Sequence, residues 1–196
     1  MIKAGFLLRI VIVLTTITLL LYGCVPAYET ETPAEKGEYE GFTVFANADF
    51  DYQIMYPDSW EYAIKSPCKV IFASSMEGLD EHDAQVCLEV INYENIGCGC
   101  SDCESVCEAI SEYMESIGGR VYDIQECHCE CEGESLAGIE LKVEYMEDDN
   151  PIKKWIAIFP YSEDMFMQFS YSADFTQYSA YMAQARLMRE SWEIRK

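Results

Sequence analysis

The stretch Ile139–Tyr171, IELKVEYMEDDNPIKKWIAIFPYSEDMFMQFSY, decides the fold. Within Ile139–Tyr145 apolar and charged residues alternate strictly, which is typical of a strand with one buried face. Asp148–Pro151 predicts a turn, and Lys153–Phe159 and Met165–Tyr171 predict two further strands with a Pro-Tyr-Ser turn between them. We interpret these last two strands as a central antiparallel hairpin.

The rest of the chain predicts more strands and two helices. A helix is expected from Cys103 to Ile117, because apolar residues recur there at steps of three and four, and Gly118 and Gly119 end it. The second helix is expected at Phe175–Arg189, with Asp174 as its N-cap. Alternation predicts the remaining strands at Phe42–Phe45, Phe50–Tyr56, Lys69–Phe72, Gln85–Tyr93 and Arg120–Cys131, and Gly133 and Gly138 are expected in the connection that precedes Ile139.

Two short strings resemble a known family. Phe50–Trp60, FDYQIMYPDSW, resembles the aromatic, alternating opening of PsbP-like domains, and Glu190–Ile194, ESWEI, is similar to their ending. The resemblance covers roughly Phe42–Ile194. It implies an α+β fold in which an antiparallel sheet has helices on both faces, an α/β/α sandwich.

What the resemblance implies for function is limited. PsbP is the extrinsic subunit that stabilises the oxygen-evolving centre of photosystem II, and many prokaryotic lipoproteins are similar to it in fold without a photosynthetic role. No ion-binding motif of the family is matched in this sequence, so no functional residue transfers. A shared fold is also a weak guide to activity.

The first residues indicate export and lipid attachment. An apolar run at Ile10–Leu21 follows a basic start, and Gly23 precedes Cys24 as in a lipoprotein signal. Cleavage before Cys24 and its acylation would anchor the chain in membrane lipid and place the domain on the extracytoplasmic side. Tyr22 departs from the small residue usual at that position, which leaves an uncleaved membrane anchor as the alternative. Both interpretations tether the domain outside the membrane.

Composition divides the chain into three parts and excludes one class of partner. Residues 1–23 are the predicted signal peptide, residues 24–40 a flexible tether rich in Glu, Thr and Pro, and residues 41–196 one domain. The formal charge is −22, and loss of Lys3 and Arg9 with the leader makes it −24. So acidic a surface repels nucleic acid, and it suits solubility, an unidentified basic protein partner or attraction of cations.

Seven cysteines fall in two short runs that the family resemblance does not explain. The first run lies around the start of the first helix and the second on the strand that follows it. If that strand borders the start of the helix, all seven thiols converge, and the helix N-terminus lowers the pKa of Cys103. The seven are Cys98, Cys100, Cys103, Cys107, Cys127, Cys129 and Cys131.

Disulfides are one interpretation of this cluster, because a bridge in an exported protein contributes about 2 to 4 kcal/mol of stability. Nine of the ten cysteines follow Cys24, an odd number, so at least one thiol is left over. Neighbours such as Cys127 and Cys129 point the same way on a strand and cannot pair without strain. Simple burial suits Cys107, Cys68 and Cys87.

Metal binding and redox chemistry are the alternatives. Cysteines at Cys-x-Cys and Cys-x-x-Cys spacing bind soft ions such as zinc or copper(I), and His128 could add a nitrogen ligand. The step from Cys100 to Cys103 also suits a redox dithiol at a helix start, although no thioredoxin-like setting surrounds it.

No other catalytic constellation is evident. Neither His82 nor His128 lies in a nucleophile-elbow or metalloprotease motif. The sequence therefore predicts a non-enzymatic, membrane-tethered binding or assembly-support module with an unidentified protein or ion partner. The alternative is a thiolate metal-binding or redox lipoprotein that uses the clustered cysteines.

Overall fold

A computed structural model of the chain describes residues 39–75, 83–92, 103–131, 134–162 and 165–195. The predicted leader with Cys24, as well as Cys98 and Cys100, lies outside these ranges. The chain divides into two compact units, Met1–Thr30 and Glu31–Lys196, and all described residues belong to the second. Among them, no helix combines the length and the apolar character needed to cross a membrane.

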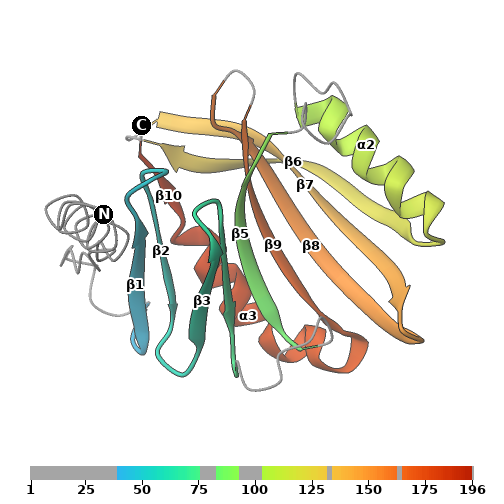
Figure 1. Cartoon of the computed structure of the whole chain (residues 1–196), viewed down its shortest axis with the longest axis horizontal. Coiled ribbons are helices and arrows are strands. Elements are labelled where there is room, and N and C mark those ends of the chain that lie inside the picture. Colours follow the sequence, from blue (N-terminus) through green and yellow to red (C-terminus); the bar gives the residue numbers. More distant parts are fainter. Residues whose placement is uncertain (1–38, 76–82, 93–102, 132–133, 163–164, 196) are drawn as a thin grey trace, which may run out of the picture. The chain divides into compact units, whose positions relative to one another are not determined.

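The described strands form a single ten-stranded sheet (Figure 1). Their order across it is β1-β2-β10-β6-β7-β8-β9-β5-β4-β3, and every neighbouring pair is antiparallel except β10 and β6. The bounds are β1 Phe42–Asn47, β2 Tyr52–Pro57, β3 Glu61–Ser66, β4 Lys69–Ala73, β5 Gln85–Ile91, β6 Arg120–Cys131, β7 Glu134–Glu147, β8 Asn150–Pro160, β9 Phe166–Asp174 and β10 Glu193–Ile194. The prediction of an antiparallel sheet is confirmed.

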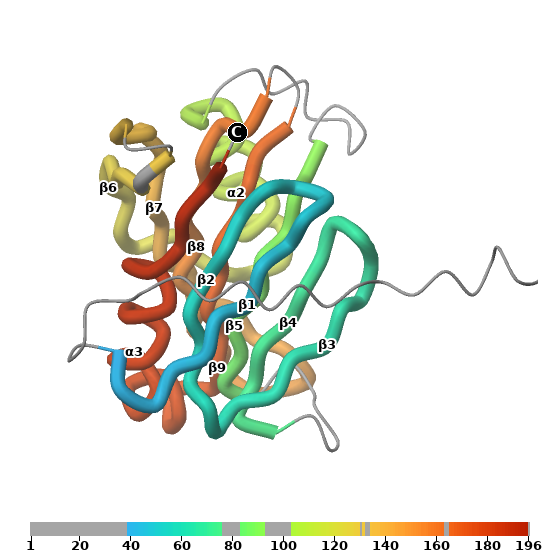
Figure 2. Tube along the Cα trace, turned by 90° about the vertical axis from the view of Figure 1, so that its left-hand side faces the viewer, coloured from blue at the N-terminus to red at the C-terminus, as the bar shows by residue number. Residues whose placement is uncertain are grey.

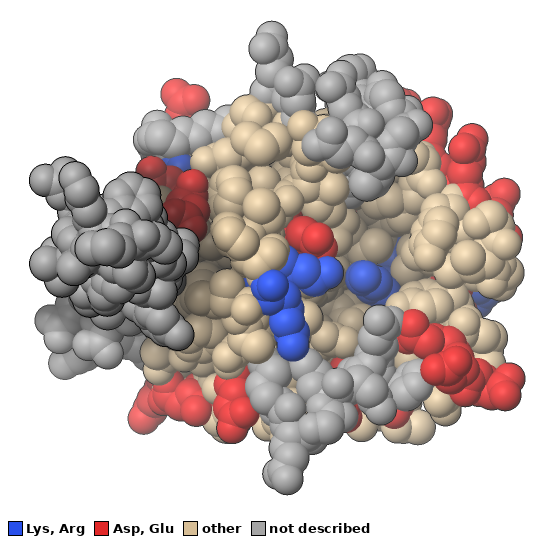
Figure 3. Space-filling view, viewed as in Figure 1, with Lys and Arg blue, Asp and Glu red and all other residues tan. Residues whose placement is uncertain are grey.

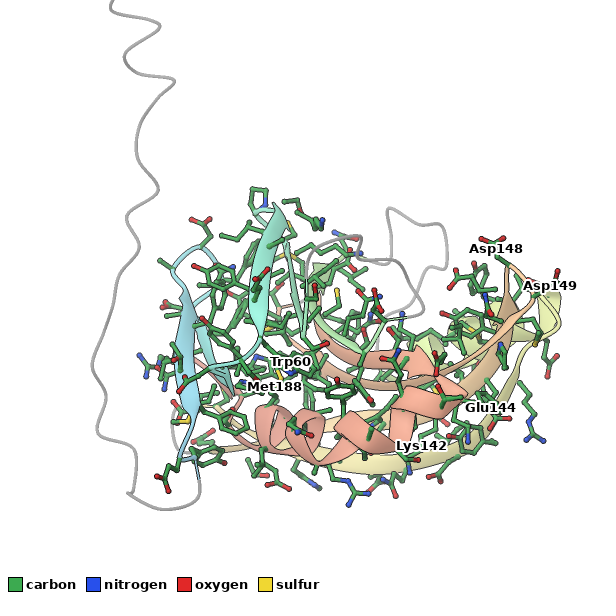
Figure 4. The ribbon with its side chains drawn as sticks, turned by 90° about the horizontal axis from the view of Figure 1, so that it is seen from below. Trp60, Lys142, Glu144, Asp148, Asp149 and Met188 are labelled. Carbon is green, nitrogen blue, oxygen red and sulfur yellow. The ribbon has the colours of Figure 1, made fainter. Side chains whose placement is uncertain are left out.

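The stretch quoted first supplies the centre of this sheet. Strands β7, β8 and β9 run as two successive hairpins, in which Leu141 lies opposite Ile156 and Trp155 lies opposite Tyr171. The predicted turn between β7 and β8 is present, at the tip of the hairpin labelled at the right of Figure 4.

Helices cover both faces of the sheet, as the family resemblance implies (Figure 1). Helix α2, Cys103–Ser116, packs on β6, β7 and β8, and its core includes Ile156. Helix α3, Phe175–Glu190, packs on β2, β8 and β9, and its core includes Trp155 and Phe159. Because side chains alternate along β8, one strand supplies both cores.

The helix ends follow the predicted signals. Asp174 caps α3, since its Oδ1 accepts hydrogen bonds from the amide groups of Thr176 at 2.7 Å and Gln177 at 2.8 Å. Gly118, with φ +76°, follows the end of α2, and only glycine adopts that backbone conformation without strain.

The two ends of the sheet approach each other, so that β1 and β2 lie beside β3 and β4 (Figures 1 and 2). Aromatic side chains join them: the Phe45 ring lies 5.0 Å from that of Tyr62 and 5.4 Å from that of Phe72. Tyr56, from the family-like string, also contacts Tyr62 and Phe72, so aromatic residues from both ends close the sheet around the core that contains α3.

Gly138 lies inside β7, not in the connection where the sequence placed it. A Cβ atom there would overlap the backbone oxygen of Ile158 and stand 2.5 Å from Cδ1 of the Phe159 ring. Glycine is therefore required by the close approach of β8, and it leaves room for the Phe159 ring on the α3 face of the sheet.

Candidate functional site

The predicted cysteine cluster divides between the two faces of the sheet. Cys103 and Cys107 belong to the core under α2, whereas Cys127, Cys129 and Cys131 of β6 belong to the core under α3. The structure thus brings the three β6 cysteines together in one row and separates them from the two on the helix. His128 is exposed on β6.

The chemistry of these cysteines stays a prediction. The thiols of Cys68, Cys87, Cys107, Cys127 and Cys131 are unbridged. Within the ranges that the structure describes, no three side chains of the metal-binding types converge on one point. Cys98 and Cys100, the other two of the predicted seven, lie outside those ranges.

A cleft of about 730 Å³ opens between the β6–β7 hairpin and the C-terminal half of α3. We call it the α3 cleft and define it by six of its lining residues, Cys127, Lys142, Trp155, Arg186, Arg189 and Trp192. Lys142 of β7 lies opposite Trp155 of β8 in the sheet (Figure 4). The cleft therefore includes part of the predicted cysteine row together with three cationic side chains.

Arg189 is the centre of this cleft. The residue is buried, with 7% of its surface exposed. Its Nη2 donates a hydrogen bond of 2.9 Å to the carbonyl oxygen of His128, and its Cζ lies 4.6 Å from the centroid of the Phe159 ring and 5.8 Å from that of Trp192. A guanidinium that packs against two aromatic rings is oriented with little freedom.

The end of α3 is fixed to the sheet, which explains why Arg189 is held in place. The backbone amide of Met55 on β2 donates to Oγ of Ser191 at 2.9 Å, directly after the helix. Strand β10 then pairs with β2 and β6 on its two sides. Trp192 lies between these anchors and is buried against Phe159.

Three residues that line the cleft each carry an N–H group that is buried without a hydrogen-bond partner among the described residues. These groups are Nε of Arg189, Nε1 of Trp155 and Nε1 of Trp192. All three are donors with no accepting capacity. Buried polar groups are normally hydrogen-bonded, so these three donors are exceptions in the part of the chain that the structure describes.

Burial sets the protonation of the nearby thiol. It raises the pKa of Cys127, although the charge of Arg189 and its hydrogen bond to that thiol act in the opposite direction. Burial also raises the pKa of Cys107 under α2. Neutral thiols are weak nucleophiles, so the cleft as built favours binding over thiol chemistry.

A second cleft of about 860 Å³ runs between α2 and the β6–β7 hairpin. Its lining contains the thiols of Cys103 and Cys107 and is strongly acidic, with Glu104, Glu108, Glu112, Glu115 and Glu126. Figure 3 shows acidic side chains over the part of the surface where Figure 1 places α2. The acidity predicted from composition is thus spread along the rim of this face.

Sequence reasoning did not single out Arg189, Lys142, Trp155 or Trp192 as site residues. One signal was present, because Arg189 follows Ala185 and Met188 on the buried side of α3 and thus places a cation on an apolar stripe. The cleft itself forms from segments far apart in the chain, which no local pattern reveals.

Comparison with known proteins gives a fold and no closer relative. No protein-family model matches the chain, and no curated protein matches it in sequence. The solution structure of cyanobacterial PsbP (CyanoP) from Synechocystis is similar, with a TM-score of 0.55 and 10% identity over 84% of this chain and 98% of that chain.

Two further solved structures are similar. LpqN, described as involved in cell envelope biogenesis of Mycobacterium tuberculosis, has a TM-score of 0.50 and 14% identity over 78% of this chain and 90% of its own. A protein of unknown function from Pseudomonas aeruginosa, described as a putative regulator, has a TM-score of 0.50 and 11% identity over 76% of this chain and 94% of its own. Together with the antiparallel sheet and its two helical faces, these similarities show that the described domain has a PsbP-like fold.

Proposed function

We propose that this chain is a lipid-anchored extracytoplasmic protein whose PsbP-like domain binds a partner and does not transform it. Acylated Cys24 would hold it at the outer face of a membrane, and the acidic tether would give the domain reach. The α3 cleft, with its buried donors that lack partners, is the observation that carries the binding role.

The fold supports this proposal through an envelope protein of similar architecture. LpqN is described as involved in cell envelope biogenesis, and its structure is similar to this one with a TM-score of 0.50 at 14% identity. The analogy concerns architecture and location, because fold similarity does not transfer an activity.

The side chains of the cleft support binding over catalysis. Burial raises the pKa of Cys127 in its lining, which keeps that thiol neutral, and Arg189 acts as a hydrogen-bond donor. A general base near the thiol would favour nucleophilic chemistry. His128, the nearest candidate in sequence, is exposed on β6 and contributes its carbonyl oxygen to Arg189.

Lipid attachment is tested by expressing the full chain in a bacterial host and measuring the intact mass of the membrane-extracted protein. We expect a chain that begins at Cys24 and carries the mass of a diacylglyceryl group. Cys24→Ser should remain unprocessed, whereas Cys68→Ser, at an exposed position on the domain, should be processed normally. A full-length chain with Met1–Gly23 intact and no added lipid would contradict the proposal.

A further inference from the structure

The α3 cleft contains a buried positive charge for which the described residues supply no counter-ion. A buried cation costs several kcal/mol unless an anion or a complete set of hydrogen bonds compensates it. Arg189 is buried, yet its contacts are the His128 carbonyl, the Cys127 thiol and the rings of Phe159 and Trp192. In the part of the chain that the structure describes, no carboxylate pairs with its guanidinium.

The Cys127 thiol does not supply the missing negative charge. Burial raises its pKa despite the neighbouring guanidinium, so it stays protonated near neutral pH. The carbonyl oxygen and the ring faces offset part of the cost, since each presents a partial negative charge. The remaining charge favours an anion that comes from outside the chain.

The unpartnered hydrogen-bond groups point to the same kind of ligand. Nε of Arg189 and the indole nitrogens of Trp155 and Trp192 belong to residues that line the cleft, and none of the three has an acceptor among the described residues. An unmade hydrogen bond at a buried donor costs about 1 to 3 kcal/mol. An oxygen anion supplies both an acceptor for hydrogen bonds and the compensating negative charge.

The surroundings restrict the charge and shape of that anion. Lys142 and Arg186 also line the cleft, but Lys142 forms an ion pair with Asp123 at 2.6 Å. Three glutamates in the lining add negative charge, Glu134, Glu140 and Glu190. With a formal charge of −22 on the whole chain, one negative charge is favoured over two. Trp155, Trp192 and Met182 give the lining an apolar part, and about 730 Å³ is in the usual range of small-molecule sites.

We propose that the α3 cleft binds a small organic monoanion, a carboxylate with an apolar body, whose oxygens accept hydrogen bonds from the Arg189 guanidinium. The apolar body lies against the indole rings. This inference deepens the binding role proposed above and rests on it.

The test is calorimetric titration of the full chain, purified in detergent, with phenylacetate, phenylacetamide and phenylphosphate. Phenylacetate and phenylacetamide have nearly the same shape and differ in charge. We expect phenylacetate to bind at least about tenfold more tightly, because a charge-assisted hydrogen bond contributes about 1.5 to 3 kcal/mol. Equal affinities, no binding of phenylacetate, or tighter binding of phenylphosphate would overturn the assignment.

Variants locate the binding. Arg189→Gln should weaken phenylacetate binding by about tenfold or more, and Arg186→Gln, at an exposed position on α3, by a smaller factor. Lys69→Gln on β4 is the matched control, because it removes the same charge outside the cleft and should leave the affinity unchanged. If Arg189→Gln does not fold, Arg186→Gln decides. Equal losses in Arg186→Gln and Lys69→Gln would mean general attraction and would refute the site.

This experiment separates the two proposals. The mass of the processed chain tests anchoring and does not depend on the cleft. Rapid alkylation of Cys127 at neutral pH, together with no binding of phenylacetate, would show that a thiolate is the counter-ion of Arg189, and the ligand proposal would fail while the anchored domain remained.

Discussion

Gly138→Ala should lower the free energy of unfolding by about 2 to 3 kcal/mol, the upper part of the range for overpacking a core. The added methyl would overlap the backbone oxygen of Ile158 and lie 2.5 Å from Cδ1 and 2.7 Å from Cε1 of Phe159. Carbon atoms in contact are about 3.5 to 4.0 Å apart, so the ring must move by about an ångström. The carbonyl cannot move without shifting the β7–β8 ladder.

The same substitution should also displace Arg189 in the α3 cleft, because Arg189 packs against the ring of Phe159. Urea unfolding of the full chain in detergent, followed by tryptophan fluorescence, measures the stability. Ala137→Ser, at an exposed neighbouring position of β7, is the control and should stay within about 0.5 kcal/mol of the parent. A Gly138→Ala variant as stable as that control would refute the close-packing argument.

Three further predictions concern the helix cap, one buried thiol and the divided cysteines. Asp174→Ala should cost about 1 kcal/mol in the same urea assay, whereas Asp174→Asn should retain most of the stability because its side chain still accepts. Burial raises the pKa of Cys87 to about 11, so this thiol keeps its proton to a higher pH in the folded state than in the unfolded state. Stability from this thiol is complete below about pH 9 and is lost as pH rises toward 11, and Cys87→Ala should flatten that decline in unfolding titrations; an unchanged slope would contradict the burial argument. Peptide mapping of protein purified without reductant should find no bridge from Cys107 to Cys127, since the sheet separates them, and detecting one would show that α2 is placed wrongly.

The main strands and both helices could be predicted because each carries a strong local period. Helix α2 was expected at Cys103 to Ile117 and is found at Cys103–Ser116, and the cap at Asp174 is confirmed. Strand β3 was missed, because nearly all of its residues are exposed and it has no buried alternation. Strand β10, two residues long, is too short for any period to show.

The candidate site was less accessible to sequence reasoning. The cysteine runs were conspicuous, but whether their thiols converge depends on which face of the sheet each run occupies. The alternation of side chains along a strand does not say which face a helix covers. Cys107 and Cys129 therefore lie in different cores. Arg189 was hidden as the last cation of an ordinary amphipathic helix, although its position after Met188 marks it as buried.

The central claim is that the α3 cleft, with the indoles of Trp155 and Trp192 in its wall, binds an organic carboxylate. The chain has three tryptophans, and Trp60 does not line that cleft. It lies elsewhere in the core, against the ring of Tyr181 (Figure 4). An amide and indole ¹H–¹⁵N NMR titration of the full chain with phenylacetate should therefore shift two of the three indole N–H signals to saturation and leave that of Trp60 in place. Three unchanged signals, or three that move together, would contradict the account.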